Sequence, residues 1–387
     1  MKEVCIIGGG ASALMCACFV KNNVNITIYE KTSKLGKKII VSGNGRCNLT
    51  NRNMNKHSYS CNINNYMQRF TNEQTIDFFN SIGLETYADN EGRVYPITNS
   101  SQSVFDVLNN YIKQKNNIKF VPNAEIVDVF NEKSQYFIKL SDSSIKKYDA
   151  VVFASGNQTN LKLLDKFNVE YNNFLPSLCA LHTDTSKNLS GIRVFNVGVS
   201  CSINNDKFYE EGEVLFKEDA ISGIVIFNLS AFMSRKKSFA NDIYVDFLPK
   251  MNKQELINEL SKRVVNLSKL KVKDFFTGLF VGAISEQILS KAHLNYNLSV
   301  STINNKQIEC IVDIIKNYHI KTFSPCDNNQ VCSGGVKLSC LDDNLQSTNN
   351  NGLYFMGEVV DVDGVCGGYN LQWAWTSGKI VGESLWN

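Results

Sequence analysis

The chain has 387 residues, of which 43% are hydrophobic and 20% are charged, and its formal net charge is +3. This composition is typical of a globular protein with two or three domains. A net charge so close to zero does not indicate a nucleic-acid or membrane surface, so we expect neither partner. The longest strongly apolar run, Phe275 to Ile284, is shorter than the roughly 20 residues of a membrane-spanning helix. A charged, strand-like start without a signal peptide favours the cytoplasm.

The N-terminus predicts a βαβ unit. Val4 to Ile7 form a short apolar run, which is typical of a buried parallel strand, and Asn25 to Tyr29 form a second one. Between them, Gly8 to Ala13 supply the pattern G-x-G-x-x-A at the start of a helical apolar spacing. Glu30 follows the second strand, about 20 residues past the glycines, which completes the context of a dinucleotide-binding motif.

Each position of this motif has a physical role. Gly8 allows a tight turn, Gly10 lets the backbone approach a pyrophosphate, and Ala13 lets the helix pack on the strand. The first turn of the helix offers free N–H groups to the phosphates. The Glu30 carboxylate would bind ribose hydroxyls and repel a 2′-phosphate, which favours FAD or NAD over NADP. The predicted contacts in this unit are Gly8, Gly10, Ala11, Ser12, Ala13, Glu30 and Lys31.

Two later strands favour FAD over NAD. Asp149 to Gly156 is an apolar run that ends in Ala-Ser-Gly, and Gly352 to Glu358 is another that ends in Gly-Glu. Both resemble strand signatures of flavoproteins with two dinucleotide folds, with Ser155 in place of threonine and Glu358 in place of aspartate.

Two longer motifs carry a more specific resemblance. They are GKKIIVSGNGRCNLTN, from Gly36 to Asn51, and VDGVCGGYNLQWAWTSGKIVG, from Val362 to Gly382. With weaker matches at Glu91 to Pro96 and Gln330 to Val336, the chain resembles a bacterial FAD-dependent oxidoreductase family of the aminoacetone oxidase and bile-acid dehydro-reductase (BaiN-like) type. The family usually has a glycine-, serine- and proline-rich stretch after the first of the two later strands, where this chain has Asn157 to Phe167.

The resemblance implies that the loop from Gly36 to Asn51 wraps FAD. Lysines there would neutralise the pyrophosphate or face solvent, glycines would let amides approach the flavin ring, and Arg46 and Asn48 would donate hydrogen bonds. Cys47 is either a redox partner of the flavin or, as we favour, a packed structural thiol. The implied FAD contacts are Lys37, Lys38, Ser42, Gly43, Arg46, Cys47, Asn48, Ile126, Ser155, Gly156, Gly357, Glu358, Gly368, Tyr369, Asn370 and Leu371.

The C-terminal motif predicts a last helix that begins within Gly367 to Leu371, because apolar residues recur at helical spacing from there. A helix N-terminus aimed at the flavin pyrimidine would stabilise the negative charge of the reduced ring. We expect Trp373 and Trp375 to pack in the core.

The fold class that follows is α/β: a doubly wound Rossmann-like FAD-binding domain interrupted by an insertion with a β-barrel-like part and a small helical part. The predicted domains are 1–177 with 331–387 for FAD, 178–250 with 296–330 for the β-rich insert, and 251–295 for the helical part. Within the insertion we expect strands over 183–202, 213–227, 242–247 and 298–312, and helices over 252–270 and 272–292.

Cysteines and histidines assign neither a metal nor a catalytic residue. The 12 cysteines contain no CxxC pair, so we expect reduced core thiols and no metal site. The histidines, His57, His182, His293 and His319, lie outside the flavin motifs. A second G-x-G-x-x-G in a strand–helix context is also absent from the sequence, so NAD(P)H would bind only transiently.

The sequence therefore predicts an FAD-dependent oxidoreductase that transfers a hydride between flavin N5 and a small organic substrate. NAD(P)H or oxygen would complete the cycle, and the resemblance favours a reductase. Two alternatives stay open: a non-enzymatic flavoprotein with a structural or redox-sensing FAD, and a tRNA-modifying flavoenzyme, which the near-neutral charge disfavours. The sequence assigns no oligomeric state.

Overall fold

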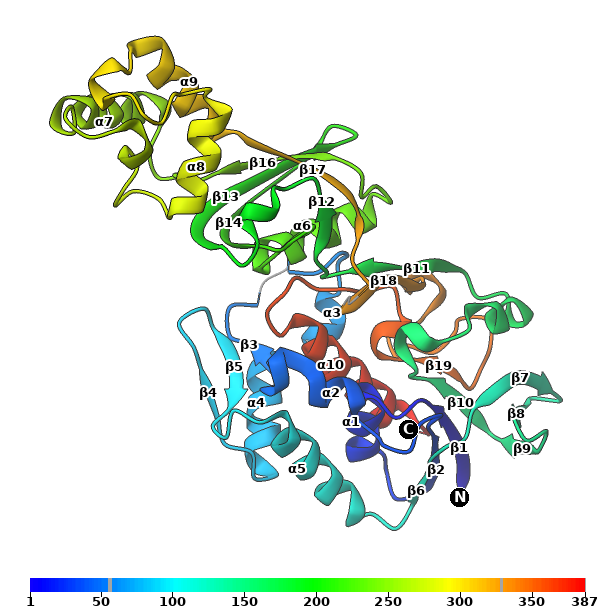
Figure 1. Cartoon of the computed structure of the whole chain (residues 1–387). Helices are drawn as coiled ribbons and strands as arrows, with labels where there is room; N and C mark the ends of the chain where they lie inside the picture. Colours follow the sequence, from blue (N-terminus) through cyan, green and yellow to red (C-terminus); the bar gives the residue numbers. More distant parts are fainter. Residues whose placement is uncertain (55–57, 328–329, 387) are drawn as a thin grey trace. The chain divides into compact units, whose positions relative to one another are not determined.

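The computed structural model of the chain describes residues 1–54, 58–327 and 330–386 (Figure 1). Of the four histidines, His57 lies outside these residues. Contacts divide the chain into two compact units, which we describe separately. Unit 1 comprises Met1–Leu175 and Gln330–Asn387, and unit 2 comprises Pro176–Asn329.

Unit 1 is built on a parallel sheet of five strands in the order β19-β10-β1-β2-β6. The strands are β1 (Lys2–Ile7), β2 (Val24–Tyr29), β6 (Ile118–Val121), β10 (Ala150–Phe153) and β19 (Leu353–Phe355). All residues of β10 and β19 are buried, as expected for strands that are covered on both faces. The predicted Rossmann-like sheet is therefore confirmed.

The strand register aligns the C-terminal ends of four strands, β1, β2, β10 and β19. Ile7 pairs with Tyr29 on one side and with Phe153 on the other, and Phe153 pairs with Phe355. The segments that follow these four residues consequently begin side by side at the same edge of the sheet, which is the edge where doubly wound sheets bind their ligands.

Two helices far apart in sequence, α1 (Ala11–Phe19) and α10 (Tyr369–Ser384), pack against each other (Figure 1). Glycines on α10 allow this close contact. A Cβ atom at Gly378 would lie 2.4 Å from the backbone oxygen of Ser12, and one at Gly382 would lie 2.6 Å from that of Cys16. Larger residues at either position would push the two helices apart.

The rest of unit 1 surrounds this frame. Its helices are α2 (Lys37–Val41), α3 (Asn64–Met67), α4 (Asn72–Ser81) and α5 (Ser101–Lys113). Its small antiparallel sheets are β3 (Thr50–Asn51), β5 (Arg93–Pro96) and β4 (Thr86–Ala88), and β7 (Ile126–Glu132), β8 (Gln135–Leu140) and β9 (Ile145–Tyr148). β11 (Tyr171–Ser177) pairs with β18 (Val331–Val336).

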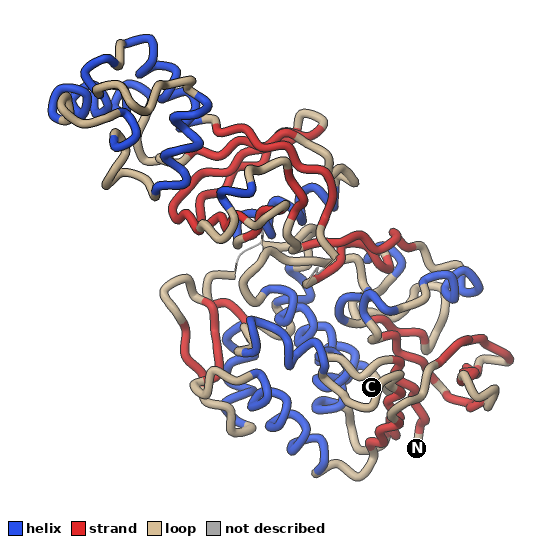
Figure 2. Tube along the Cα trace, viewed as in Figure 1, coloured by secondary structure: helices blue, strands red, loops and turns tan. Residues whose placement is uncertain are grey.

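Unit 2 contains a closed six-strand barrel in the order β12-β15-β14-β13-β16-β17. The strands are β12 (Leu181–Thr183), β13 (Arg193–Ile203), β14 (Asp206–Phe216), β15 (Ala220–Ser222), β16 (Asp242–Asp246) and β17 (Tyr318–Pro325). The helices are α6 (Ile224–Arg235), α7 (Lys253–Asn266), α8 (Gly282–Lys291) and α9 (Asn305–Lys316). Figure 2 shows the strands in red and the helices in blue, with α7, α8 and α9 together at one end of the unit.

Two strand predictions for the insertion are wrong. The segment 298–312 contains most of α9, whose Ile308, Ile311 and Ile315 are buried at helical spacing behind an Asn304 capping box. Isoleucine has a high strand propensity, but here the helical spacing of the isoleucines and the N-terminal capping box favour a helix. The predicted strand over 213–227 also ends early, because α6 begins at Ile224. The predicted domain division remains a prediction, except that 305–316 is helical rather than β-rich.

A search of the described residues finds no helix that is both long enough and apolar enough to span a bilayer.

Candidate functional site

Four segments that the sequence singled out meet at the carboxyl edge of the parallel sheet. They follow β1, β2, β10 and β19, which are neighbours in the sheet. They begin with Gly8, Glu30, Ala154 and Met356, the residues that directly follow the level row of strand ends. The segments that are predicted to bind FAD therefore lie along one edge of the sheet.

The three glycines after β1 differ in the space around them. Gly8 has φ +99°, and a Cβ there would lie 2.6 Å from the Cα of Ser155. A Cβ at Gly9 would lie 2.1 Å from the Leu35 side chain. At Gly10, by contrast, the nearest atom would be the backbone oxygen of Ala154, at 3.8 Å. Gly8 is required by its positive φ and by the close Ser155 backbone, whereas Gly10 leaves room for a Cβ.

The first turn of α1 has no side-chain cap. Its Ser12 and Ala13 are buried, and the Ser12 hydroxyl donates to the backbone oxygen of Met356 at 3.5 Å. Ala11 is half-buried at the helix start. Uncapped N–H groups at the start of a helix bind anions through hydrogen bonds and the helix dipole. This turn fits a pyrophosphate.

Glu30 is oriented by its neighbours. Its carboxylate accepts the Gly9 N–H (2.9 Å), the Thr32 N–H (2.9 Å) and the Thr32 hydroxyl (2.8 Å). A carboxylate has about four lone-pair sites, so it retains capacity for ribose hydroxyls. The Glu30 backbone oxygen accepts the Ala124 N–H (3.0 Å), and this contact brings the half-buried Ile126, the first residue of β7, close to Glu30.

The predicted contact Glu358 joins three segments of the site. It forms an ion pair with Lys38, and its other oxygen accepts the Cys332 N–H at 2.9 Å. A Cβ at Gly156 would lie 2.8 Å from this carboxylate, so the absence of a side chain at Gly156 makes room for it. Gly357 lies next to the buried Ser377, whose hydroxyl accepts its N–H at 2.9 Å.

The three predicted lysines, Lys31, Lys37 and Lys38, are all exposed. The ammonium of Lys38 also donates to Asn157 at 3.0 Å, and that of Lys31 donates to Gln158 at 2.9 Å. Asn157, which the sequence did not single out, also donates from its side-chain amide to the Cys332 thiol at 3.1 Å. Only its place in the unusual stretch after Gly156 could have indicated it.

The loop that holds Ser42 to Asn48 follows α2. The Ser42 hydroxyl donates to the backbone oxygen of Ile39 at 2.6 Å, and Gly43 has φ +55°. Cys47 is fully buried, and burial raises the pKa of its thiol to about 12. That pKa supports the packed structural thiol over a reactive thiolate. Arg46 is exposed and lies over the Tyr95 ring, 4.6 Å from its centroid.

Asn48 joins this loop to the start of α10. In the orientation that satisfies both groups, its side chain donates to the backbone oxygen of Thr50 (3.0 Å) and accepts the Gly368 N–H (3.1 Å). A Cβ at Gly368 would lie 2.6 Å from the same Thr50 oxygen. Asn51 donates to the backbone oxygen of Gly367 at 3.0 Å. The end of the first long motif therefore positions the start of the helix that carries the second.

α10 begins at Tyr369, as the sequence predicts, and Trp373 and Trp375 are buried as expected. Tyr369 itself is buried and Leu371 is partly buried. The Asn370 side chain accepts the Gly364 N–H and donates to the Gly364 oxygen, both at 2.9 Å. Asn370 therefore shapes the turn that precedes the helix.

Two further protic groups are Cys366 and Tyr95. Cys366 is half-buried in the turn that precedes α10. Tyr95 lies on β5, under the guanidinium of the exposed Arg46. Burial raises the pKa of Tyr95, Arg93 and Arg46 lower it, and Asp89 and Cys366 raise it.

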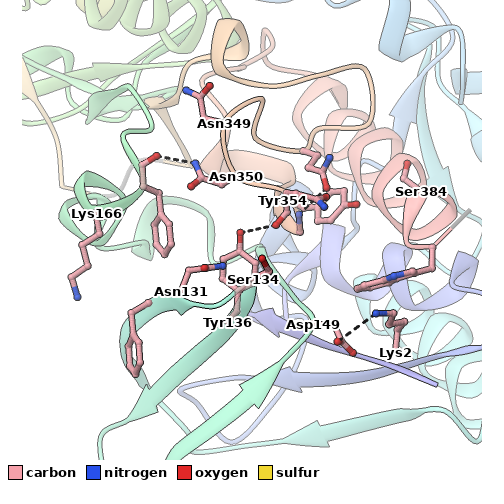
Figure 3. Close-up of a pocket in the computed structure, with 16 residues that line it drawn as sticks. Lys2, Asn131, Ser134, Tyr136, Asp149, Lys166, Asn349, Asn350, Tyr354 and Ser384 are labelled. Atoms are coloured by element: carbon pink, nitrogen blue, oxygen red, sulfur yellow. Dashed lines mark hydrogen bonds and ion pairs between the residues drawn. The ribbon is translucent and has the colours of Figure 1, made fainter.

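A cavity of about 700 Å³ in unit 1 lies elsewhere (Figure 3). Its lining includes Lys2, Asp149 and Gly352, which lie where β1, β10 and β19 begin. This is the amino edge of the sheet. Ligands of doubly wound sheets bind at the carboxyl edge, so this cavity is separate from the candidate cofactor site.

The residues present fit FAD. The first turn of α1 is uncapped, a carboxylate with free lone pairs follows the second strand, and the start of a second helix is fixed beside a glycine-containing loop. These features suit, in turn, a pyrophosphate, a ribose and the polar edge of a flavin.

Comparisons with known proteins agree with this fit. The chain matches the model of the HI0933-like protein Rossmann domain over residues 2–384. It is 28% identical to a 3-dehydro-bile acid delta(4,6)-reductase of Clostridium scindens, with 99% of each chain covered. Ribosomal RNA dihydrouridine synthases of Haemophilus influenzae and Escherichia coli are 24% and 22% identical to it, over 99% of this chain and 98% of theirs. The chain belongs to the HI0933-like Rossmann family of FAD-binding oxidoreductases.

Proposed function

We propose that the protein is an FAD-dependent reductase that saturates a carbon–carbon double bond conjugated to a carbonyl group. The observation that carries the proposal is the level row of strand ends at Ile7, Tyr29, Phe153 and Phe355, which sets the predicted cofactor contacts along one edge. FAD, once bound and reduced, would supply the hydride from its flavin ring.

The predicted contacts divide among the parts of the cofactor. Glu30, with Ile126 nearby, would bind the adenosine end, and the first turn of α1 behind Gly10 would bind the pyrophosphate. The loop from Ser42 to Asn48 and the start of α10 would hold the flavin ring, because Asn48 joins them. The Lys38–Glu358 pair would lie toward the ribityl chain.

The activities for which the relatives are named share one chemistry. A 3-dehydro bile acid carries a ketone, and a delta(4,6)-reductase saturates double bonds conjugated with it. Dihydrouridine is uridine with one ring double bond saturated, and that bond is also conjugated to a carbonyl. In both, a hydride adds to the electron-poor carbon and a proton adds to its neighbour. This shared chemistry supports a conjugated double bond as the group reduced here.

The proton must come from the protein or from water, and Cys366 is the group we assign. It is partly exposed in the turn just before the N-cap of α10, the helix start that would hold the flavin ring. The proton leaves the Cys366 Sγ for the carbon next to the one that receives the hydride. Tyr95, on β5, is the second protic group that we consider.

NAD(P)H is the electron donor that we propose, and it would bind transiently because the sequence holds a single dinucleotide motif. The test is an anaerobic visible spectrum of the purified protein. We expect flavin bands that bleach with NADH or NADPH and return when a conjugated enone is added, but not when an alkene without the carbonyl is added. Recovery only with oxygen would make the protein an oxidase, and flavin that no donor reduces would indicate a redox sensor or structural flavoprotein.

A further inference from the structure

The helical part of unit 2 carries a surface on which exposed aliphatic side chains lie among exposed lysines. We name it the basic-apolar surface, and it consists of Lys262, Lys269, Lys271, Lys273, Val265, Leu270 and Leu298. The three aliphatic side chains are 73%, 43% and 48% exposed, in that order. Single exposed aliphatic residues are common on proteins, whereas a group of them rimmed by charge is typical of an interaction surface.

The chain places the first of these residues on one side of α7 and on the segment that follows it. Lys262 and Val265 are three residues apart near the end of α7, so they lie on the same side of the helix. Leu270 comes after the helix, directly between Lys269 and Lys271. Each aliphatic side chain here therefore has a lysine as a close neighbour.

Leu298 joins this surface from a segment that is distant in sequence. Its backbone oxygen accepts the N–H of Val272 at 2.9 Å, and the next residue, Ser299, forms a β-bridge with Lys271. The Val272 side chain is 1% exposed and packs in the core of unit 2, so it fixes the backbone between two of the lysines. The surface is therefore pre-organised, which lowers the entropy cost of binding a partner.

The positive charges of the basic-apolar surface are uncompensated. The sequence from Lys262 to Lys273 contains no acidic residue, and Glu259 and Asp274 lie beyond its two ends. Within the part of the chain that the structure describes, no carboxylate forms an ion pair with any of the four lysines of the surface. Lys253 and Lys316 of the same unit, by contrast, pair with aspartates.

We propose that the basic-apolar surface docks the protein on a bilayer that contains anionic lipids. The lysines would meet the negative headgroups, and the aliphatic side chains would enter the boundary between headgroups and acyl chains. Lysine suits this boundary, because its aliphatic stem packs beside apolar groups while its ammonium group stays in water. The docking is peripheral, since no helix of the described residues is long and apolar enough to cross a bilayer.

Charge complementarity and the aliphatic residues together favour a bilayer over a nucleic acid. A nucleic acid would neutralise the lysines but leave the three aliphatic side chains in water. Proteins that bind single strands stack the bases on aromatic rings, and the sequence from Lys262 to Lys273 contains none. The net charge of the whole chain, from which we expect no membrane partner, averages over all faces, whereas a bilayer meets only one of them.

Two pairs of variants test the charges and the aliphatic side chains separately. K262Q/K269Q/K271Q/K273Q removes four charges from the surface, and its control, K119Q/K139Q/K146Q/K147Q, removes four from exposed positions on strands of unit 1. V265S/L298S removes two aliphatic side chains, and its control, I97S/I145S, removes two from unit 1 that are 58% and 55% exposed. Circular dichroism and the flavin spectrum verify that every variant is folded and loaded.

The probe is a suspension of sucrose-loaded vesicles of phosphatidylglycerol and phosphatidylcholine in equal parts, and the comparison vesicles contain phosphatidylcholine alone. The fraction of protein that sediments with the vesicles is measured at several KCl concentrations. We expect the unaltered protein to bind the anionic vesicles and not the neutral ones. The lysine variant should bind about tenfold or more weakly at low salt and should lose most of the salt dependence.

V265S/L298S should bind about threefold more weakly at every salt concentration and keep its salt dependence, because it loses apolar burial and no charge. Both controls should match the unaltered protein. A protein that does not sediment with anionic vesicles, that sediments equally with both kinds, or that is weakened equally by a variant and its control would overturn the proposal. So would binding to a fluorescein-labelled RNA hairpin without binding to the vesicles.

The inference does not depend on the proposed reductase function, and the two are measured apart. Vesicle binding is read without an electron donor or a substrate, and flavin bleaching by NAD(P)H is read without vesicles. A protein that bleaches but does not bind vesicles would lose the docking surface only, whereas one that binds vesicles but does not bleach would lose the reductase function only.

Discussion

The hydroxyl of Thr50 donates to the side-chain oxygen of Gln372 across 2.6 Å, and both side chains are fully buried. The amide nitrogen of Gln372 in turn donates to the backbone oxygen of Phe70 (3.1 Å) and to the hydroxyls of Thr75 (2.8 Å) and Thr376 (3.0 Å). Every polar atom of the Gln372 side chain is thus used. This network fixes α10 to the end of the loop that is predicted to hold the flavin.

Replacement of Gln372 by Leu should destabilise unit 1 by about 3 kcal/mol, because it leaves buried partners unsatisfied. It should also weaken FAD binding. Urea unfolding followed by tryptophan fluorescence reports unit 1 selectively, since the tryptophans, Trp373, Trp375 and Trp386, all lie there. Gln102→Leu, at an exposed position of α5, is the control and should unfold at the same urea concentration as the unaltered protein. Equal midpoints for both variants would contradict the role of the network.

Substitution by alanine should affect stability at Gly8 and FAD binding at Gly10. Gly10→Ala has room for its Cβ and an ordinary backbone conformation, so the apoprotein should fold with an unchanged melting temperature but bind FAD at least tenfold more weakly. Gly8→Ala meets the Ser155 backbone at φ +99° and should lower the melting temperature itself. Flavin content and thermal melts of the apoproteins separate the two effects. A Gly10→Ala protein that retains full FAD affinity would remove the pyrophosphate from this turn.

The sequence predicts the Rossmann-like sheet well because its strands are short, buried and followed by motifs with strict backbone demands. It predicts the start of α10 because apolar residues recur at helical spacing from there. It fails for α9, where strand propensity and helical spacing conflict. It also misses the link from Asn157 to Cys332 and the Lys38–Glu358 pair, because such contacts join residues far apart in sequence.

Buried thiols should make unit 1 sensitive to alkaline pH. Burial raises the pKa of Cys47 to about 12. An unfolded thiol loses its proton near pH 8.5, so between about pH 9 and 12 the unfolded state binds fewer protons than the folded state. Stability should therefore fall as the pH rises through this window, by about 1.4 kcal/mol per pH unit for each such thiol.

The pH dependence has a direct check. Unfolding free energies of the unaltered protein and of Cys47→Ala, measured from pH 8 to pH 11, should differ in slope, with the variant less sensitive. At neutral pH, mass spectrometry after iodoacetamide treatment should find Cys310, which is exposed, alkylated and Cys47 unmodified. Rapid alkylation of Cys47 in the folded protein would contradict its assignment as a structural thiol.

Cys366 should matter for substrate reduction and not for loading or reduction of the cofactor. Removal of a general acid typically costs about 100-fold or more in rate. We therefore expect Cys366→Ala to keep its flavin content and to bleach with NAD(P)H at the unaltered rate, while its re-oxidation by a conjugated enone slows by about 100-fold. Cys366→Ser, which keeps a weaker proton donor, should be intermediate and should shift the pH profile of the re-oxidation step. The control is Cys310→Ala, at an exposed position of α9 in unit 2, which should behave like the unaltered protein. If Cys366→Ala is re-oxidised as fast as the control, the proton comes from Tyr95 or from water, and the assignment to Cys366 is wrong.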